Sequence, residues 1–207
     1  MMTDRGEHWR LFIALEVPDE TRSSVAQAIA PLAAEHADHL RFTDPATWHL
    51  TLAFLGALDP SWADVIEEAM VRAAAEVAPF AVTLGRAGRF GRGILWLGFD
   101  DPSYASILTL NRAVRSVLSA RDVPHDTKPL HPHLTLARQR DRDGLGVSRS
   151  RLAEVDAAMA RFGSDSGGAE VASAAQSWAV TRLVLLRSHL GDGSPRHEPI
   201  ARVALRA

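Results

Sequence analysis

The pentapeptide His-Leu-Thr-Leu-Ala occurs twice in the chain, at residues 49–53 and 133–137, nearly half the chain length apart. Each copy lies in an apolar run that is typical of a β-strand, and an identical repeat of this length indicates an internal duplication. Because side chains alternate across a strand, His49 and Thr51 share one face. The opposite, apolar face is expected to carry Trp48, Leu50, Leu52 and Phe54.

The second copy repeats this arrangement, with Leu134 and Leu136 directed to the core and His133 and Thr135 together on the other face. If the two halves pack about a pseudo-twofold axis, the two His–Thr pairs face one another across a cleft. One imidazole can then act as a base on an attacking oxygen while the other protonates a leaving oxygen on the far side of a phosphorus atom. Threonine hydroxyls can stabilise the charge that builds on the remaining phosphate oxygens.

The composition is that of an ordinary soluble protein, and it excludes several classes of enzyme. Hydrophobic residues make up 46% of the 207 residues and charged residues 23%, close to the averages for globular domains. The absence of cysteine excludes disulfides, thiolate catalysis and cysteine-ligated zinc. No apolar stretch is long enough to span a bilayer, and the polar residues 1–7 contain no signal-peptide core. We therefore expect a cytoplasmic protein without a membrane partner.

The charge of the chain argues against a protein that holds long duplexes. The net charge is −2, whereas duplex binding requires a clustered basic face. Most of the positive charge is carried by arginine, whose guanidinium group pairs well with two oxygens of one phosphate. A small anionic site therefore remains compatible with the composition.

Apolar patterns alternate between strand and helix periods, and several strand pairs are joined by short loops. This pattern favours an α+β fold with antiparallel sheets, in which residues 1–207 form one bilobal domain with a central cleft. A helix N-cap is expected at Asp19, and loops or turns at 43–45, 85–93, 164–168 and 191–195. The expected strands are 10–17, 41–42, 49–55, 80–84, 94–99, 133–138, 177–187 and 200–205, and the expected helices are 19–37, 61–77, 104–120 and 150–162.

Other histidines provide weaker signals. His131 and His133 have a spacing that occurs in metal sites, but Pro132 separates them and no Asp, Glu or Cys follows nearby. We therefore expect no metal and no cofactor. His125, His189 and His197 have no partner pattern, so the surface is the expected location for each.

Both copies of the repeat, with their neighbours, resemble the signatures of the 2H phosphoesterases, specifically the RNA 2′,3′-cyclic phosphodiesterases that are also called 2′-5′ RNA ligases. The resemblance covers nearly the whole chain: residues 10–14 look like the opening strand of that family, residues 48–56 like its first signature, residues 132–138 like its second and residues 183–190 like its late strand and loop. The family usually has a tyrosine after the next turn, where this chain has His197.

The resemblance implies hydrolysis of a 2′,3′-cyclic phosphate at an RNA end or on a nucleotide to a 2′-phosphomonoester, without a metal. It implies that His133 is the base that activates water and that His49 is the acid that protonates the departing 3′-oxygen, with Thr51 and Thr135 bound to the phosphate. The trailing Arg138 lies on the opposite strand face unless a bulge intervenes. It is either a phosphate ligand or part of a structural ion pair.

Aromatic and guanidinium faces bind the bases of single-stranded RNA ends. Phe42, Phe90 and Arg92 are therefore candidates for the wall of the cleft, with core packing or plain exposure as the alternative. Other activities also stay open. These are 2′-5′ ligation of RNA halves, hydrolysis of another cyclic phosphate such as ADP-ribose 1″,2″-cyclic phosphate, and non-catalytic binding of RNA ends. A monomer is expected.

Overall fold

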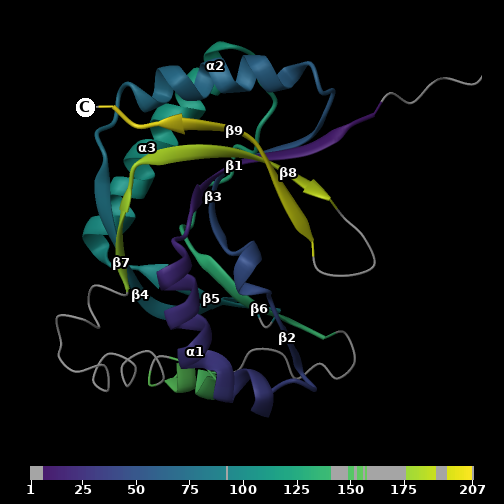
Figure 1. Cartoon of the computed structure of the whole chain (residues 1–207), viewed down its shortest axis with the longest axis vertical. Helices are drawn as coiled ribbons and strands as arrows, with labels where there is room; N and C mark the ends of the chain where they lie inside the picture. Colours follow the sequence, from purple (N-terminus) through teal and green to yellow (C-terminus); the bar gives the residue numbers. More distant parts are fainter. Residues whose placement is uncertain are drawn as a thin grey trace, which may run out of the picture.

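Two antiparallel sheets form the framework of the protein, as the computed structural model in Figure 1 shows. The structure describes residues 7–91, 93–140, 149–151, 153–155, 157, 176–189 and 195–206. Within them, one sheet has four strands in the order β3-β1-β8-β9 and the other has five in the order β2-β6-β5-β4-β7. All the strand pairs in these residues are antiparallel, so the α+β class and its antiparallel sheets are confirmed.

The elements follow the expected order along the chain. The strands are β1 (Trp9–Glu16), β2 (Leu40–Phe42), β3 (His49–Leu58), β4 (Phe80–Phe90), β5 (Ile94–Phe99), β6 (Leu134–Gln139), β7 (Ser177–Val180), β8 (Arg182–His189) and β9 (Arg196–Ala204). The helices are α1 (Asp19–Glu35), the 3-10 turn η1 (Pro45–Thr47), α2 (Trp62–Ala74) and α3 (Asp101–Ala120).

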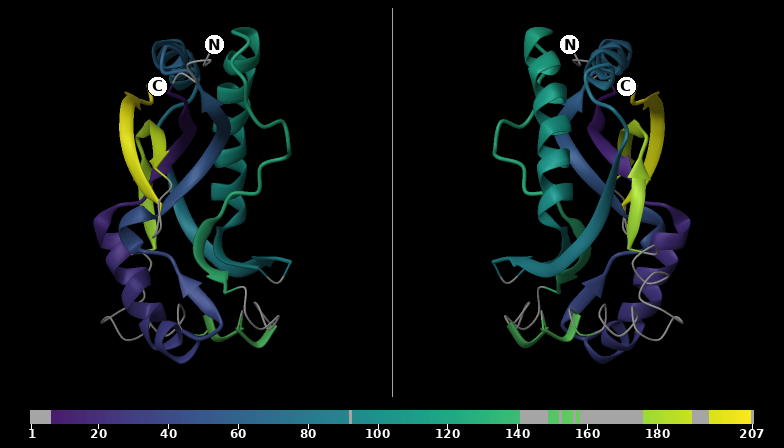
Figure 2. Two further views of the ribbon diagram at one scale, coloured as in Figure 1. Left: turned by 90° about the vertical axis from the view of Figure 1, so that its right-hand side faces the viewer. Right: turned by 90° about the vertical axis from the view of Figure 1, so that its left-hand side faces the viewer.

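Helices α2 and α3 pack against each other, with α2 on β8 and β9 and α3 on β3 and β4. Figure 2 shows α2 at one end of the molecule and α1 at the other, beside the five-stranded sheet. The apolar side chains of both pentapeptides are buried as expected, with Leu50, Leu52, Leu134 and Leu136 each at most 2% exposed. These leucines belong to one continuous core, so the hydrophobic effect holds each repeat in its sheet.

Several expected boundaries are wrong. The single strand expected over residues 177–187 is interrupted at Thr181, and its two parts, β7 and β8, belong to different sheets. The connection expected over 85–93 is mostly strand, because β4 continues to Phe90 and pairs with β5. Asp19 is not an N-cap but the first residue of α1, whose N-cap is Pro18. The apolar pattern of residues 177–187 does not reveal the change of sheet, because both halves of this run are buried in the same core.

Some expectations concern residues whose structure is only partly described. The described parts of the helix expected over 150–162, namely 150, 151, 153–155 and 157, are helical. The loop at 164–168 and Arg92 lie outside the described residues, as does the turn at 191–195 apart from Pro195. No helix in the described residues has both the length and the hydrophobicity needed to cross a membrane.

Candidate active site

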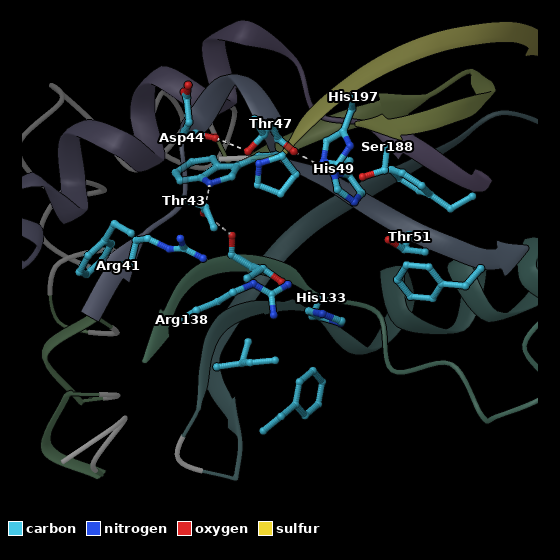
Figure 3. Close-up of a pocket in the computed structure, with 18 of the residues that line it drawn as sticks. Arg41, Thr43, Asp44, Thr47, His49, Thr51, His133, Arg138, Ser188 and His197 are labelled. Carbon is cyan, nitrogen blue, oxygen red and sulfur yellow. Dashed lines mark hydrogen bonds between the residues drawn. The ribbon is translucent and has the colours of Figure 1, made fainter. Parts of the chain in front are cut away.

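A cavity of about 560 Å³ lies between the two sheets and contains both repeats. Its wall includes His49 and Thr51 from the four-stranded sheet, Thr135 from the five-stranded sheet, and His133, which directly precedes β6 of that sheet. Figure 3 shows these side chains directed towards one another from the two sides. The further lining residues are Arg10, Phe12, Arg41, Phe42, Thr43, Asp44, Thr47, Trp48, Phe54, Phe90, Ile94, Arg138, Ser188, Pro195 and His197.

The two imidazoles are held in the same way. The Nδ1 atom of His49 lies 2.8 Å from the carbonyl oxygen of Thr47, and the Nδ1 atom of His133 lies 2.7 Å from that of His131. A carbonyl oxygen only accepts, so each Nδ1 carries a proton and donates it. In the neutral ring the remaining nitrogen, Nε2, is then a free base. Each repeat therefore offers the cavity one nitrogen that can accept or return a proton.

Burial keeps these imidazoles neutral in the free protein. The pKa of His49 is lowered from 6.5 to about 4, mainly by burial and to a smaller extent by positive charge on His197, His133 and Arg138. Burial also lowers the pKa of His133, with a contribution from the charges of His131 and Arg138. A bound phosphate acts in the opposite direction, because a nearby negative charge favours the protonated imidazole. Protonation of the site is therefore coupled to the binding of an anion.

A β-bulge follows the His-x-Thr of each repeat. In the first copy the register passes from Ala14–Thr51 to Ile13–Ala53, and in the second from Trp96–Thr135 to Leu95–Ala137. The extra residue is thus the second leucine of each pentapeptide. A bulge of one residue shifts the alternation of side chains by one position. The residue three positions after each threonine therefore returns to the His–Thr face.

The bulges decide where Phe54 and Arg138 lie. Both side chains line the cavity, so Arg138 lies on the same face as Thr135. The expectation that Phe54 lies in the core with Leu52 is wrong, since Phe54 is 51% exposed. The two repeats thus place different chemistry at equivalent positions, a phenyl ring in one and a guanidinium group in the other.

At each bulge, the backbone carbonyl oxygen of the extra leucine accepts a hydrogen bond from a residue outside the strand. The carbonyl oxygen of Leu52 accepts from Nδ2 of the buried Asn111 at 2.8 Å. The carbonyl oxygen of Leu136 accepts from the backbone N–H of Thr43 at 2.8 Å, with the Thr43 hydroxyl also within 2.9 Å. A buried carbonyl without a donor is costly, so these residues stabilise the local shape of both repeats.

Thr43 also connects the two repeats. Its hydroxyl oxygen accepts a hydrogen bond from Nε1 of Trp48 at 2.7 Å and lies 2.8 Å from the carbonyl oxygen of Thr135. Trp48 directly precedes His49, and Figure 3 shows the Thr43 contacts as dashed lines. Nothing in the sequence pattern indicates this role, because Thr43 lies in a turn between two short elements.

Aromatic rings surround both imidazoles. Phe12 and His197 lie against His49, with ring centroids 4.8 Å from it in each case. Phe90 meets His133 edge-on at 4.8 Å. The surface location expected for His197 is therefore wrong: strand β9 places it in the cavity wall. Its side chain is half-buried, which lowers its pKa.

Phe42 lines the cavity, whereas His131 and His125 do not. Phe42 lines the cavity together with Arg41, its neighbour in β2. His131 is absent from the lining and packs against Trp96 at 4.8 Å between ring centroids. Outside the cavity, His125 donates from Nδ1 to the carbonyl oxygen of Val123 at 2.8 Å. Among the described residues, no group of three or more His, Cys, Asp or Glu side chains could hold a metal ion.

Two antiparallel sheets that enclose a cavity with one His-x-Thr from each are the arrangement of a two-histidine phosphoesterase. The chain belongs to the 2′-5′ RNA ligase superfamily, whose family model matches residues 17–192.

Curated relatives support this assignment. The chain is 26% identical over 212 residues to an RNA 2′,3′-cyclic phosphodiesterase of Escherichia coli, a match that covers 97% of this chain and 98% of the relative. It is 33% identical over 138 residues to an enzyme of the same name from Geobacillus stearothermophilus, covering 62% of this chain. The chain spans only 41% of the length of that second relative.

Solved structures share the fold. Escherichia coli LigT complexed with 3′-AMP has a TM-score of 0.68 at 25% identity, with 97% of this chain and all of that chain covered. The TT0787 protein of Thermus thermophilus has a TM-score of 0.69 at 22% identity, covering 95% of this chain and 98% of the other, which is a likeness of fold alone.

Proposed function

We propose that this protein hydrolyses the 2′,3′-cyclic phosphate at an RNA end or on a nucleotide to a 2′-phosphomonoester. The observation that carries the proposal is the meeting of the two His-Leu-Thr-Leu-Ala repeats in one cavity. The names of the curated relatives support the choice of substrate. Because residues from both sheets line the cavity, we further propose that the two lobes act as one bilobal unit.

In the proposed reaction, Nε2 of His133 accepts a proton from water as the water oxygen forms a bond to phosphorus. The bond between phosphorus and the 3′-oxygen breaks, and Nε2 of His49 delivers a proton to that oxygen. The hydroxyls of Thr51 and Thr135 and the guanidinium of Arg138 stabilise the negative charge that builds on the phosphate oxygens. The reaction leaves His133 protonated and His49 neutral. Proton exchange with solvent then restores the starting protonation state of both imidazoles.

The low pKa of His49 is compatible with its role as an acid only when phosphate is bound. The cyclic phosphate carries one negative charge, and its arrival in a cavity of low polarity raises the pKa of a neighbouring imidazole. Arg138 opposes part of this effect, since its charge lowers the pKa of both histidines. Substrate binding thus favours the protonated, acidic form of His49. The proposed chemistry requires no metal ion.

Substitution by asparagine tests these roles most sharply. The amide nitrogen of asparagine can replace the Nδ1 donor to the backbone carbonyl, while the catalytic Nε2 is lost. His49→Asn and His133→Asn should each lower kcat on a nucleoside 2′,3′-cyclic phosphate by at least about 100-fold, with EDTA present. His125→Asn is the matched control, because His125 makes the same contact to the carbonyl two residues before it but lies outside the cavity.

Wild-type turnover in either cavity variant, with unchanged thermal unfolding, would refute the assignment. Turnover that disappears when EDTA is added would refute the metal-independent mechanism. Product analysis distinguishes the related activities: joining of 2′-5′ RNA halves, or preferred turnover of ADP-ribose 1″,2″-cyclic phosphate, would retain the site but change its substrate. Tight binding of a 2′-phosphate without any turnover would instead indicate a module that only binds RNA ends.

A further inference from the structure

Three polar side chains form a row across the four-stranded sheet beside His49. Ser188 of β8 is paired with His197 of β9, and Arg10 lies one residue before Leu11, which is paired with Arg187. Arg10 and Ser188 are therefore neighbours across β1 and β8. All three residues of the row line the cavity, and Figure 3 shows Ser188 and His197 next to His49.

The polar side-chain groups of this row have no hydrogen-bond or ion-pair partner among the described residues. No hydrogen bond or ion pair there involves the guanidinium of Arg10 or the hydroxyl of Ser188, and Nδ1 of His197 is buried without a hydrogen-bond partner. Buried polar groups in folded proteins are normally satisfied, so the unpartnered Nδ1 of His197 indicates a ligand, and the exposed guanidinium of Arg10 lies on the same wall of the cavity.

Four other cations of the same strands form ion pairs with acidic side chains, so an open cation is not the rule in this sheet. Arg182 and Arg202 both pair with Glu16, at 2.7 and 3.0 Å. On β8, Arg187 pairs with Glu7, and His189 lies 2.7 Å from Glu198. Arg187 and His189 flank Ser188 on β8, so their charges are neutralised at the same end of the sheet, whereas Arg10 on the cavity wall forms no ion pair among the described residues.

The chemistry of the row suits a phosphate. A guanidinium group, a hydroxyl and an imidazole can all donate to phosphate oxygens, and the guanidinium adds charge-assisted hydrogen bonds. The acidic residue of the cavity wall, Asp44, is already engaged, because its Oδ1 accepts from the backbone N–H of Ala46 at 2.9 Å. Asp44 is also the N-cap of the 3-10 turn before β3 and does not belong to the strands of the row.

We propose that Arg10, Ser188 and His197 bind a second phosphate, the one esterified to the 5′-oxygen of the terminal nucleoside. This inference rests on the proposed function, in which His49 protonates the 3′-oxygen and the ribose therefore lies on the His49 side of the cleft. The row occupies that side. The site then prefers RNA ends and 5′-phosphorylated nucleotides over nucleosides that carry the cyclic phosphate alone.

Calorimetry with two product-like probes tests the subsite without relying on turnover. Adenosine 2′,5′-bisphosphate should bind at least about tenfold more tightly than adenosine 2′-monophosphate, as expected for an added charge-assisted contact. Arg10→Gln should remove this gain and leave the affinity for the monophosphate unchanged. Arg182→Gln removes a similar charge that is already paired with Glu16 and should preserve the gain.

Ser188→Ala provides a second variant with little effect on packing, and it should reduce the gain by a few fold. Equal affinity for the two probes in the wild-type protein, or a gain that survives Arg10→Gln, would overturn the second subsite while leaving the proposed reaction intact. Binding of neither probe, together with no hydrolysis of any cyclic phosphate, would overturn both.

Discussion

The depressed pKa of His49 predicts a specific acid sensitivity of the fold. His49 binds a proton near pH 6.5 when the chain is unfolded but only near pH 4 when it is folded. Between these values the unfolded state binds more protons, so stability is full above about pH 6.5 and falls as the pH decreases towards 4. From these two pKa values, the loss between pH 7.5 and pH 4.5 is roughly 2–3 kcal/mol for this one residue.

The variant His49→Asn isolates this contribution, because asparagine does not titrate and can still donate to the carbonyl oxygen of Thr47. Urea unfolding followed by tryptophan fluorescence gives the free energy of unfolding at each pH. The wild-type protein should lose roughly 2–3 kcal/mol more than the variant between the two conditions. His133 and His197 titrate in both proteins, so their effects cancel in the difference. Equal losses in the two proteins would refute the claim that burial keeps His49 neutral.

Four further predictions concern the same framework. Thr135→Val should lower kcat on a cyclic phosphate by about 100-fold with little change in stability, as measured by steady-state kinetics and thermal unfolding. The maximum of kcat/KM should lie below pH 6.5, because burial lowers the pKa values of both cavity imidazoles; a maximum above pH 7 would contradict this. Asn111→Ala, which removes the donor to the first bulge carbonyl, should lower the free energy of unfolding by about 1–3 kcal/mol in urea titrations. Gly88→Ala should cost about 1–3 kcal/mol, because the new Cβ would lie 2.0 Å from the indole of Trp96, whereas Gly93→Ala, with nothing within 4 Å, should cost little.

The duplicated pentapeptide was sufficient to predict the two strands and the burial of their leucines. Alternation of side chains is a local property, and the leucines carry most of the buried surface of each repeat. The same rule misplaced Phe54, because it does not anticipate the bulge at Leu52. A bulge depends on tertiary partners, here Asn111 for the first copy and Thr43 for the second, and those partners are distant from the strand in sequence.

Sequence reasoning identified the residues that lie inside the repeats but few of the others that line the cavity. Arg10, Ser188 and His197 come from the strands β1, β8 and β9, which are neighbours in the sheet although β1 is separated from the other two by most of the chain. Their spacing therefore contains no periodic signal. For His197, the departure from the family's usual tyrosine was a signal, although it indicated a difference at that position and not a place beside His49.

The order β3-β1-β8-β9 has a consequence for synthesis on the ribosome. Strand β1 pairs with β8, which follows it by most of the length of the chain. Until that distant segment emerges, the edge of β1 that later pairs with β8 stays unpaired, and unpaired edges promote association with other chains. The wall that carries His49 is thus completed late, so a chain truncated before Arg182 should be both inactive and prone to aggregate.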